Sequence, residues 1–203
     1  SNGVKSVGAF KNNLLIGFGT QYNNTGKIVY RGEWKNGKIN GHGIKYYKSG
    51  EKEYEGEWKN DKMNGSGTYY RESGEKYIGA FKDDLFNGNG ISYYKSGEKE
   101  YEGEWENSKM NGNGIFYYES GEKYIGAFKD GLFNGNGISY SKSGEKQYDG
   151  EWENDKRNGK GIFYGPNYRY DGEWLNDRKN GKGIIYLEDG SIYQNGIFKN
   201  GEF

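Results

Sequence analysis

The chain of 203 residues has no cysteine, one proline and one histidine. Without cysteine it forms no disulfide and offers no thiolate, so the sequence does not indicate whether the protein works in an oxidising or a reducing compartment. No apolar run approaches the roughly 20 residues of a membrane-spanning helix, and no signal-peptide pattern opens the chain. An excess of charge is also missing, because 29 basic and 29 acidic side chains cancel. Bulk electrostatics therefore predict no nucleic-acid partner.

Aliphatic side chains are scarce as well. Leu, Ile, Val and Phe together make up about 16% of the residues, a fraction that would normally indicate disorder. Tyrosine and tryptophan reverse that interpretation, because 21 Tyr and 5 Trp recur at fixed spacing. Each of these rings can bury roughly 150–250 Å². The 37 glycines are spread evenly along the chain, which argues against one compact core.

The chain is built from an internal repeat. Residues 54–100 and 101–147 are two versions of one sequence, and each version divides into a half with Gly-Glu-Trp and a half with Gly-Ala-Phe. We call the residue two before the glycine of each triplet position 0, and successive positions 0 lie 22 to 24 residues apart. Such fixed-period similarity marks a repeat architecture, and we expect a single array over residues 1–203. The copies start near Ser6, Tyr30, Tyr54, Tyr77, Tyr101, Tyr124, Tyr148, Tyr170 and Gln194.

Each copy is predicted to form a β-hairpin. Positions 6 and 7 are Asn, Asp, Gly or Ser throughout, as in Asn60-Asp61 and Asp130-Gly131. These residues tolerate the positive φ that both central residues of a type I′ turn require. A second turn, such as Ser49-Gly50, leads into the next hairpin. The fold class predicted is all-β: an elongated, single-layer, twisted antiparallel sheet of about eight and a half stacked hairpins.

The first turn also predicts the pairing of side chains. In the third copy it places Trp58 opposite Met63, Gly56 opposite Gly65, and Tyr54 opposite Gly67. A glycine opposite a tyrosine leaves room for the ring to lie flat, so one side of the sheet, the aromatic face, should be a ladder of rings over glycines. The return to the next hairpin varies by one residue, and we expect the shorter returns to carry a bulge or an odd-length turn. The ladder residues named are Tyr54, Gly56, Trp58, Gly65, Gly67, Tyr101, Gly103, Trp105, Gly112 and Gly114.

The opposite side, the isoleucine–tyrosine face, carries Ile at position 14 and Tyr at position 16. Glutamates at position 3 border it in the Gly-Glu-Trp copies. An apolar stripe beside acidic residues suits the apolar side of a basic amphipathic helix. The alternative is that Ile and Tyr only pair across strands for stability. The candidate partner-binding residues are Glu57, Glu104, Glu151, Ile91, Ile115, Ile138, Tyr70, Tyr93, Tyr117 and Tyr140.

The residues argue against an enzyme. The only histidine, His42, stands where other copies carry serine, asparagine or lysine, so it is interpreted as a surface substitution. Glu55 and Glu57 are spaced like a catalytic or metal-binding carboxylate pair, but the pair recurs at Glu102 and Glu104, and a single-layer sheet offers no enclosed pocket. We therefore expect no catalytic residue, no metal site and no cofactor.

The unit Tyr54-x-Gly56-x-Trp58 followed by Asn64-Gly65-x-Gly67 resembles the MORN (membrane occupation and recognition nexus) repeat. The resemblance extends from about Ser6 to Phe203. It implies a scaffold whose grooves bind partner helices, and a membrane-junction, cytoskeletal or lipid-kinase setting in which phospholipid binding is often attributed to the repeats. The copies of about 24 residues, the Ser-Gly turns and the Gly-Ala-Phe subtype depart from the family pattern.

The function expected is a non-enzymatic scaffold or adaptor that binds a protein partner on an extended sheet face. The alternatives are a phospholipid-binding or membrane-tethering module and an accessory region of a larger enzyme. Lipid attraction is weakened because acidic residues such as Asp61 are interleaved with Lys35, Lys38 and Lys59. We expect a cytoplasmic location, free or peripheral at a membrane or the cytoskeleton, and open strand edges that allow end-to-end self-association.

Overall fold

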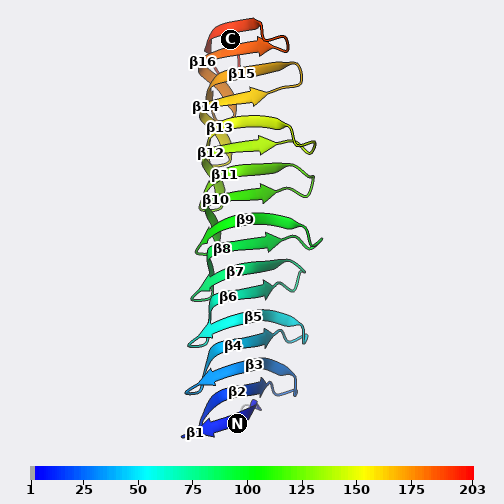
Figure 1. Ribbon diagram of the computed structural model, residues 1–203, viewed down its shortest axis with the longest axis vertical. Helices are drawn as coiled ribbons and strands as arrows, with labels where there is room; N and C mark the ends of the chain where they lie inside the picture. The colour runs from blue at the N-terminus through cyan, green and yellow to red at the C-terminus, as the bar shows by residue number, and fades with distance from the viewer. Residues whose placement is uncertain (1–2) are drawn as a thin grey trace. The chain divides into compact units, whose positions relative to one another are not determined.

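The computed structural model describes residues 3–203, in which it has seventeen strands and no helix (Figure 1). The predicted all-β class is therefore confirmed. The strands are β1 (Lys5–Lys11), β2 (Leu14–Tyr22), β3 (Ile28–Lys35), β4 (Lys38–Tyr46), β5 (Lys52–Lys59), β6 (Lys62–Tyr70), β7 (Lys76–Lys82), β8 (Leu85–Tyr93), β9 (Lys99–Glu106), β10 (Lys109–Tyr117), β11 (Lys123–Lys129), β12 (Leu132–Tyr140), β13 (Lys146–Glu153), β14 (Lys156–Tyr164), β15 (Tyr168–Leu175), β16 (Arg178–Leu187) and β17 (Ile192–Phe198).

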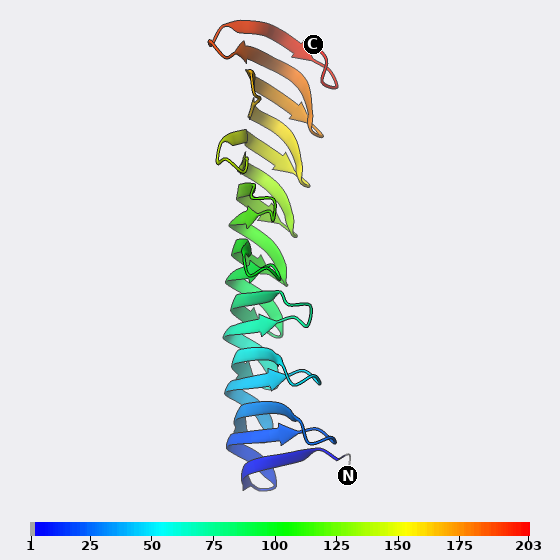
Figure 2. The same ribbon diagram turned by 90° about the vertical axis from the view of Figure 1, so that its right-hand side faces the viewer.

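The chain divides into two compact units. The first contains the described residues up to Lys99 together with Trp105–Ser108, and the second contains Glu100–Glu104 and Lys109–Phe203. In the first unit β1 to β8 pair antiparallel in chain order. In the second unit β10 to β17 do the same. Each unit is thus an open sheet of hairpins, and its strands curve visibly in Figure 2.

The predicted tight turns are present in every copy. Both residues at positions 6 and 7 have positive φ, for example 50° and 69° at Asn60 and Asp61, and 54° and 90° at Asp130 and Gly131. This is the backbone of a type I′ turn, whose twist matches that of the paired strands. The local rule about residues that tolerate positive φ therefore locates each hairpin correctly.

The predicted pairing beyond the turn is correct at its start and wrong further along. Trp58 lies opposite Met63, as expected, but Gly56 lies opposite Gly67 and Tyr54 opposite Tyr69. The register shifts between Gly56 and Trp58, because the second strand bulges there. Gly65 lies in this bulge with φ of 81°, a conformation that side chains resist. The prediction from the sequence treated Gly65 as a regular strand residue and therefore did not include this shift in register.

The bulge in the returns also differs from the prediction. It lies in the longer returns, not the shorter ones: before Tyr54 the register shifts between Lys45 and Tyr46, which leaves Glu53 without an opposite residue. Before Tyr77 the pairing is regular. The loops themselves are alike, each closed by two backbone hydrogen bonds, and the extra residue is accommodated after the loop. After both kinds of return, the residue at position 14 therefore lies opposite position 1 of the next copy, as Ile44 lies opposite Glu55 and Thr68 opposite Ile78.

Tyrosine rings at position 0 form the core of the aromatic face. Tyr54 is fully buried, and its ring lies across the paired glycines Gly56 and Gly67, where any Cβ atom would overlap it. Its hydroxyl donates a hydrogen bond to the carbonyl of Glu57 at 2.9 Å. Glycine is thus required on both strands beneath each ring. The fully buried tyrosines are Tyr30, Tyr54, Tyr77, Tyr101, Tyr124, Tyr148 and Tyr170.

Each buried tyrosine also joins its own copy to the next. The ring of Tyr54 contacts Trp58 edge-to-face at 5.0 Å between centroids and Phe81 of the following copy at 4.9 Å. In the second unit Tyr124 contacts Phe128 at 5.2 Å and Trp152 at 5.4 Å. Such pairs each add about 0.5–1.5 kcal/mol beyond the area that they bury. The aromatic face of each unit is therefore held by contacts between neighbouring copies, as in other repeat proteins.

Tryptophan adds a hydrogen bond that phenylalanine cannot. The indole nitrogen of Trp58 donates to the carbonyl of Gly43 in the preceding copy at 3.2 Å, and Trp152 donates to Gly137 at 3.1 Å. Phe81 and Phe128 occupy the same position without a donor. The two copy types therefore differ in how strongly they attach to the copy before them.

We predict that Gly67→Ala destabilises the first unit by about 1–3 kcal/mol, because the added methyl group overlaps the ring of Tyr54, which is fully buried. Ser66→Ala, one residue earlier and exposed, is the control and should change little. Urea denaturation followed by circular dichroism measures both. Equal stability of the two variants would show that the ring does not need glycine beneath it.

Candidate functional site

The isoleucine–tyrosine face keeps part of its apolar surface in solvent. Its side chains come from the second strand of each hairpin, at positions 14 and 16, and all of them are half-buried. In the first unit they are Ile44, Tyr46, Thr68, Tyr70, Ile91 and Tyr93, from β4, β6 and β8. In the second unit they are Ile115, Tyr117, Ile138, Tyr140, Ile162, Tyr164, Ile184 and Tyr186, from β10, β12, β14 and β16.

Two isoleucines that the sequence interpretation did not select widen this surface. Ile78 lies between Thr68 and Ile91 on the neighbouring strands and is 39% exposed. Ile125 lies between Ile115 and Ile138 in the same way in the second unit. Both occupy position 1 of Gly-Ala-Phe copies, where Gly-Glu-Trp copies carry an acidic residue in most cases. The difference between the two copy types was the signal that could have identified them.

Basic side chains hold the tyrosine rings of this face. The Lys76 ammonium lies 4.5 Å from the centre of the Tyr93 ring, and Lys123 lies 5.0 Å from that of Tyr140. Cation–π contacts at exposed sites are worth about 0.5–1 kcal/mol. They keep the rings in place against the sheet, so less ordering entropy is lost when a partner binds.

The glutamates at position 3 have a structural contact. A carboxylate oxygen of Glu57 accepts a hydrogen bond from the backbone N–H of Ser66 at 2.9 Å, and Glu104 accepts one from Asn113 at 3.1 Å. Glu151 does the same for Lys160 at 2.9 Å. Each carboxylate lies over the bulge glycine, so these three proposed partner contacts also hold the irregular part of the hairpin.

The acidic residues at position 1 are partly neutralised by neighbouring lysines. Lys52 contacts the Glu55 carboxylate at 2.6 Å, and Lys146 contacts Asp149 at 2.8 Å. Exposed ion pairs of this kind stabilise little. They do reduce the negative field beside the isoleucines, so the face is apolar with mixed charges at its border and is not uniformly acidic.

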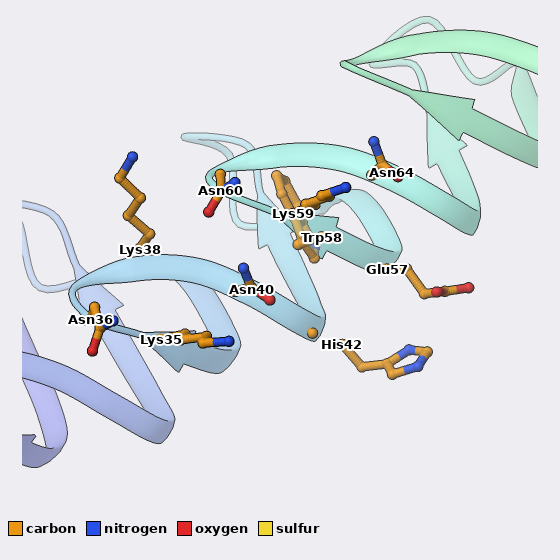
Figure 3. A pocket seen from close by; sticks show the side chains of 11 residues that line it. Lys35, Asn36, Lys38, Asn40, His42, Glu57, Trp58, Lys59, Asn60 and Asn64 are labelled. Atoms are coloured by element: carbon orange, nitrogen blue, oxygen red, sulfur yellow. The ribbon is translucent and has the colours of Figure 1, made fainter.

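Two neighbouring hollows of the first unit share His42 in their lining. On the isoleucine–tyrosine face a shallow hollow of about 400 Å³ is lined by residues that include Phe18, Ile44 and Tyr46, and Phe18 is 60% exposed. A more polar groove of about 690 Å³ lies between two consecutive hairpins (Figure 3). Its lining includes Lys35, Lys38, Asn40, His42, Glu57, Lys59 and Asn64, and a similar groove follows one copy later. Both hollows are open to solvent.

The residues considered for catalysis or metal binding are not brought together. No group of three potential metal ligands occurs within residues 3–203. His42 is exposed, and its backbone N–H donates to Glu33 at 3.3 Å. A search of the same residues finds no helix with the length and apolar character needed to cross a membrane.

The comparison with known protein families agrees with the repeat geometry. The family model of the MORN repeat matches seven segments, each of which begins at a buried tyrosine of position 0. No curated protein matches the chain. The seven segments are residues 30–52, 54–76, 77–99, 101–123, 124–146, 148–168 and 170–192.

We predict that Glu57→Ala lowers the free energy of unfolding by about 1 kcal/mol, because the Ser66 N–H loses its acceptor at the bulge. Glu57→Gln keeps an acceptor oxygen and should recover most of that loss. Glu55→Ala, two residues away on the same strand, is the control and should have little effect. Urea denaturation of the three variants measures these differences. A loss for Glu55→Ala as large as that for Glu57→Ala would mean that charge, not the bulge contact, is responsible.

Proposed function

The chain belongs to the MORN repeat family, and from this premise we propose that it is a non-enzymatic scaffold that binds a protein partner on its isoleucine–tyrosine face. One observation carries the proposal. The aromatic rings of each unit are buried against neighbouring copies, whereas Ile and Tyr of the opposite face remain half-exposed in copy after copy. Exposed apolar surface that continues over several strands is typical of interaction sites.

The spacing of the apolar side chains suits a helix laid across the strands. Ile115, Ile125 and Ile138 lie on three consecutive strands of the second unit, and neighbouring strands are about 4.8 Å apart. An amphipathic helix presents an apolar residue every three or four positions, or about every 5 Å along its axis. A helix that crosses these strands can therefore place one apolar residue against each isoleucine.

The charges at the border favour a partner helix with basic residues on its flanks. In the second unit Asp149 and Asp171 stand at position 1 of two consecutive copies beyond Ile125, and Glu151 and Glu173 stand at position 3. Glu57 and Glu151 each accept the backbone hydrogen bond at the bulge with one carboxylate oxygen. The other oxygen of each carboxylate can then contact a partner. Opposite charges at a rim mainly increase the association rate and fix the orientation of the partner.

The open form of the two hollows described above supports a binding role over catalysis. The hollows are open and lined by lysine, asparagine and aromatic side chains. Catalysis commonly needs a nucleophile or acid held next to a group that shifts its pKa, in a site shielded from water. We therefore propose that any chemistry carried out in a complex with this chain belongs to the partner.

The test is a quantitative pull-down from lysate of the native source, with labelled wild-type protein beside a triple variant in which Tyr93, Tyr117 and Tyr140 are changed to Ser. The proposal predicts a discrete protein that wild type captures and the triple variant loses, at equal folded content by circular dichroism. Purified partner and a peptide of its amphipathic segment should then reproduce the difference by calorimetry.

A matched control separates this face from general stickiness. Leu85, Leu132 and Leu175 lie beside the hairpin turns and are 38–46% exposed, so their change to Ser removes a similar amount of exposed apolar surface elsewhere. That variant should retain the partner. Equal capture by wild type and the tyrosine variant, with loss in the leucine variant, would contradict the proposed face.

The polar groove in Figure 3 favours a second candidate, binding of phospholipid headgroups. Lys35, Lys38 and Lys59 line it and can meet a phosphate. The next groove counts against a strong effect, because Lys62 there is 3.5 Å from Asp83. Adding vesicles of phosphatidylserine and phosphatidylcholine to the same set of variants decides between the two, since a headgroup site would bind vesicles with or without Tyr93, Tyr117 and Tyr140, which do not line this groove.

A further inference from the structure

The last two complete copies break the pattern of the aromatic face at position 9. This residue lies next to the hairpin turn and is apolar in the first six copies: Leu15, Ile39, Met63, Phe86, Met110 and Phe133. In the seventh and eighth copies it is Arg157 and Lys179. Two cations therefore stand, two strands apart in the second unit, where elsewhere an apolar side chain covers the rings.

Arg157 is well accommodated. Its guanidinium lies 4.3 Å from the centre of the Trp174 ring, and its Nε donates to the Asp177 carboxylate at 3.1 Å. Its Nη2 donates to the Asp177 carbonyl at 3.1 Å as well. A planar guanidinium that stacks on an aromatic ring and pairs with a carboxylate is a stable arrangement. Arg157 thus uses the single carboxylate that the next hairpin turn supplies.

Lys179, unlike Arg157, contacts aromatic rings but no carboxylate of the described residues. Its ammonium lies 4.7 Å from the centre of the Tyr168 ring and 5.0 Å from that of Tyr170, and within residues 3–203 no acidic side chain forms an ion pair with it. Arg157, in the preceding copy, obtains its carboxylate from Asp177 in the hairpin turn that follows it. The turn residue that corresponds to Asp177 for Lys179 is Gly201, which has no carboxylate. Partial burial and the nearby charge of Arg157 lower the pKa of Lys179. Arg157 and Lys179 together therefore carry one positive charge more than Asp177 balances.

We propose that Arg157 and Lys179 form a site on the aromatic face for a single carboxylate, supplied by an acidic side chain of a partner protein. The ammonium of Lys179 donates to the carboxylate, and the remaining N–H groups of Arg157 face the same anion. The rings of Tyr168, Tyr170 and Trp174 hold both cations and exclude water from one side. The site is independent of the isoleucine–tyrosine face and gives a bound protein a second point of contact on the opposite surface of the same unit.

The balance of charge selects a carboxylate over a phosphate. One carboxylate neutralises the unpaired charge, whereas a phosphate dianion would add a further negative charge close to Asp177. A carboxylate is also planar, so it can lie in the plane of the guanidinium and accept parallel hydrogen bonds.

The experiment is an NMR titration of the full chain that follows the indole N–H of Trp174. The probe is the peptide acetyl-Ala-Glu-Ala-amide, with acetyl-Ala-Gln-Ala-amide as the uncharged match and inorganic phosphate as the competing anion, at constant ionic strength. We expect a saturable shift of the Trp174 signal with the Glu peptide alone, and no shift of the Trp58 signal, whose copy has Met63 at position 9.

Lys179→Met returns position 9 to the residue type of Met63 and Met110, so this variant is expected to fold, with a higher thermal midpoint. It should weaken binding of the Glu peptide about tenfold, the effect of removing one charge-assisted hydrogen bond. Lys182→Met, exposed on the neighbouring stretch of β16, is the control and should bind as wild type does. Equal shifts with the Glu and Gln peptides, tighter binding of phosphate, or unchanged binding by Lys179→Met would each overturn the proposal.

Discussion

The fit of one tyrosine ring over two paired glycines is the constraint on which the structure depends. A single layer of strands has no second layer to cover its side chains, so it must bury apolar surface against itself. Tyr54 does so by lying flat across Gly56 and Gly67, with its hydroxyl on the Glu57 carbonyl and its ring edge-to-face with aromatic rings of two copies. The bulge at Gly65 follows from the same fit, because it brings the second strand back into register beneath the ring.

The packing of the rings gives the two faces of the sheet different roles. Because one face of each unit is buried by contacts between neighbours, the other is left to vary, and it does so together with the copy type. Copies with Trp carry acidic residues at positions 1 and 3 in most cases, whereas the Gly-Ala-Phe copies carry valine or isoleucine at position 1 and alanine at position 3, as at Ile78 and Ala80. The sequence of copy types thus sets where the exposed face is apolar and where it is acidic. Function in a repeat protein can change in this way without a change in fold.

Much of this arrangement is readable in the sequence, and the misses have physical causes. The turns were predictable because Asn, Asp and Gly at two adjacent positions leave few other conformations. The register beyond the turn was not, since a bulge glycine such as Gly65 looks like any strand residue until its φ is known. Ile78 and Ile125 differ from the acidic residues at position 1 of most Gly-Glu-Trp copies, which is a signal in the sequence, but their contact with Ile91 and Ile138 follows from the strand pairing. The missing partner of Lys179 depends on a turn residue in the next copy, Gly201, which no local pattern connects to it.

The most direct measurement of the central claim is an alkaline titration of tyrosine absorbance near 295 nm, followed together with far-ultraviolet circular dichroism. Burial raises the pKa of Tyr170 to about 12, and raises that of Tyr30, Tyr54, Tyr77, Tyr101, Tyr124 and Tyr148 as well. Because the folded-state pKa is raised, these tyrosines stabilise the fold fully below the ordinary pKa of about 10 and lose that contribution as the pH rises above it. The account predicts that the seven buried rings ionise only as the sheet unfolds, after the exposed tyrosines. Ionisation of all 21 tyrosines in one step near pH 10, with the sheet intact, would contradict it.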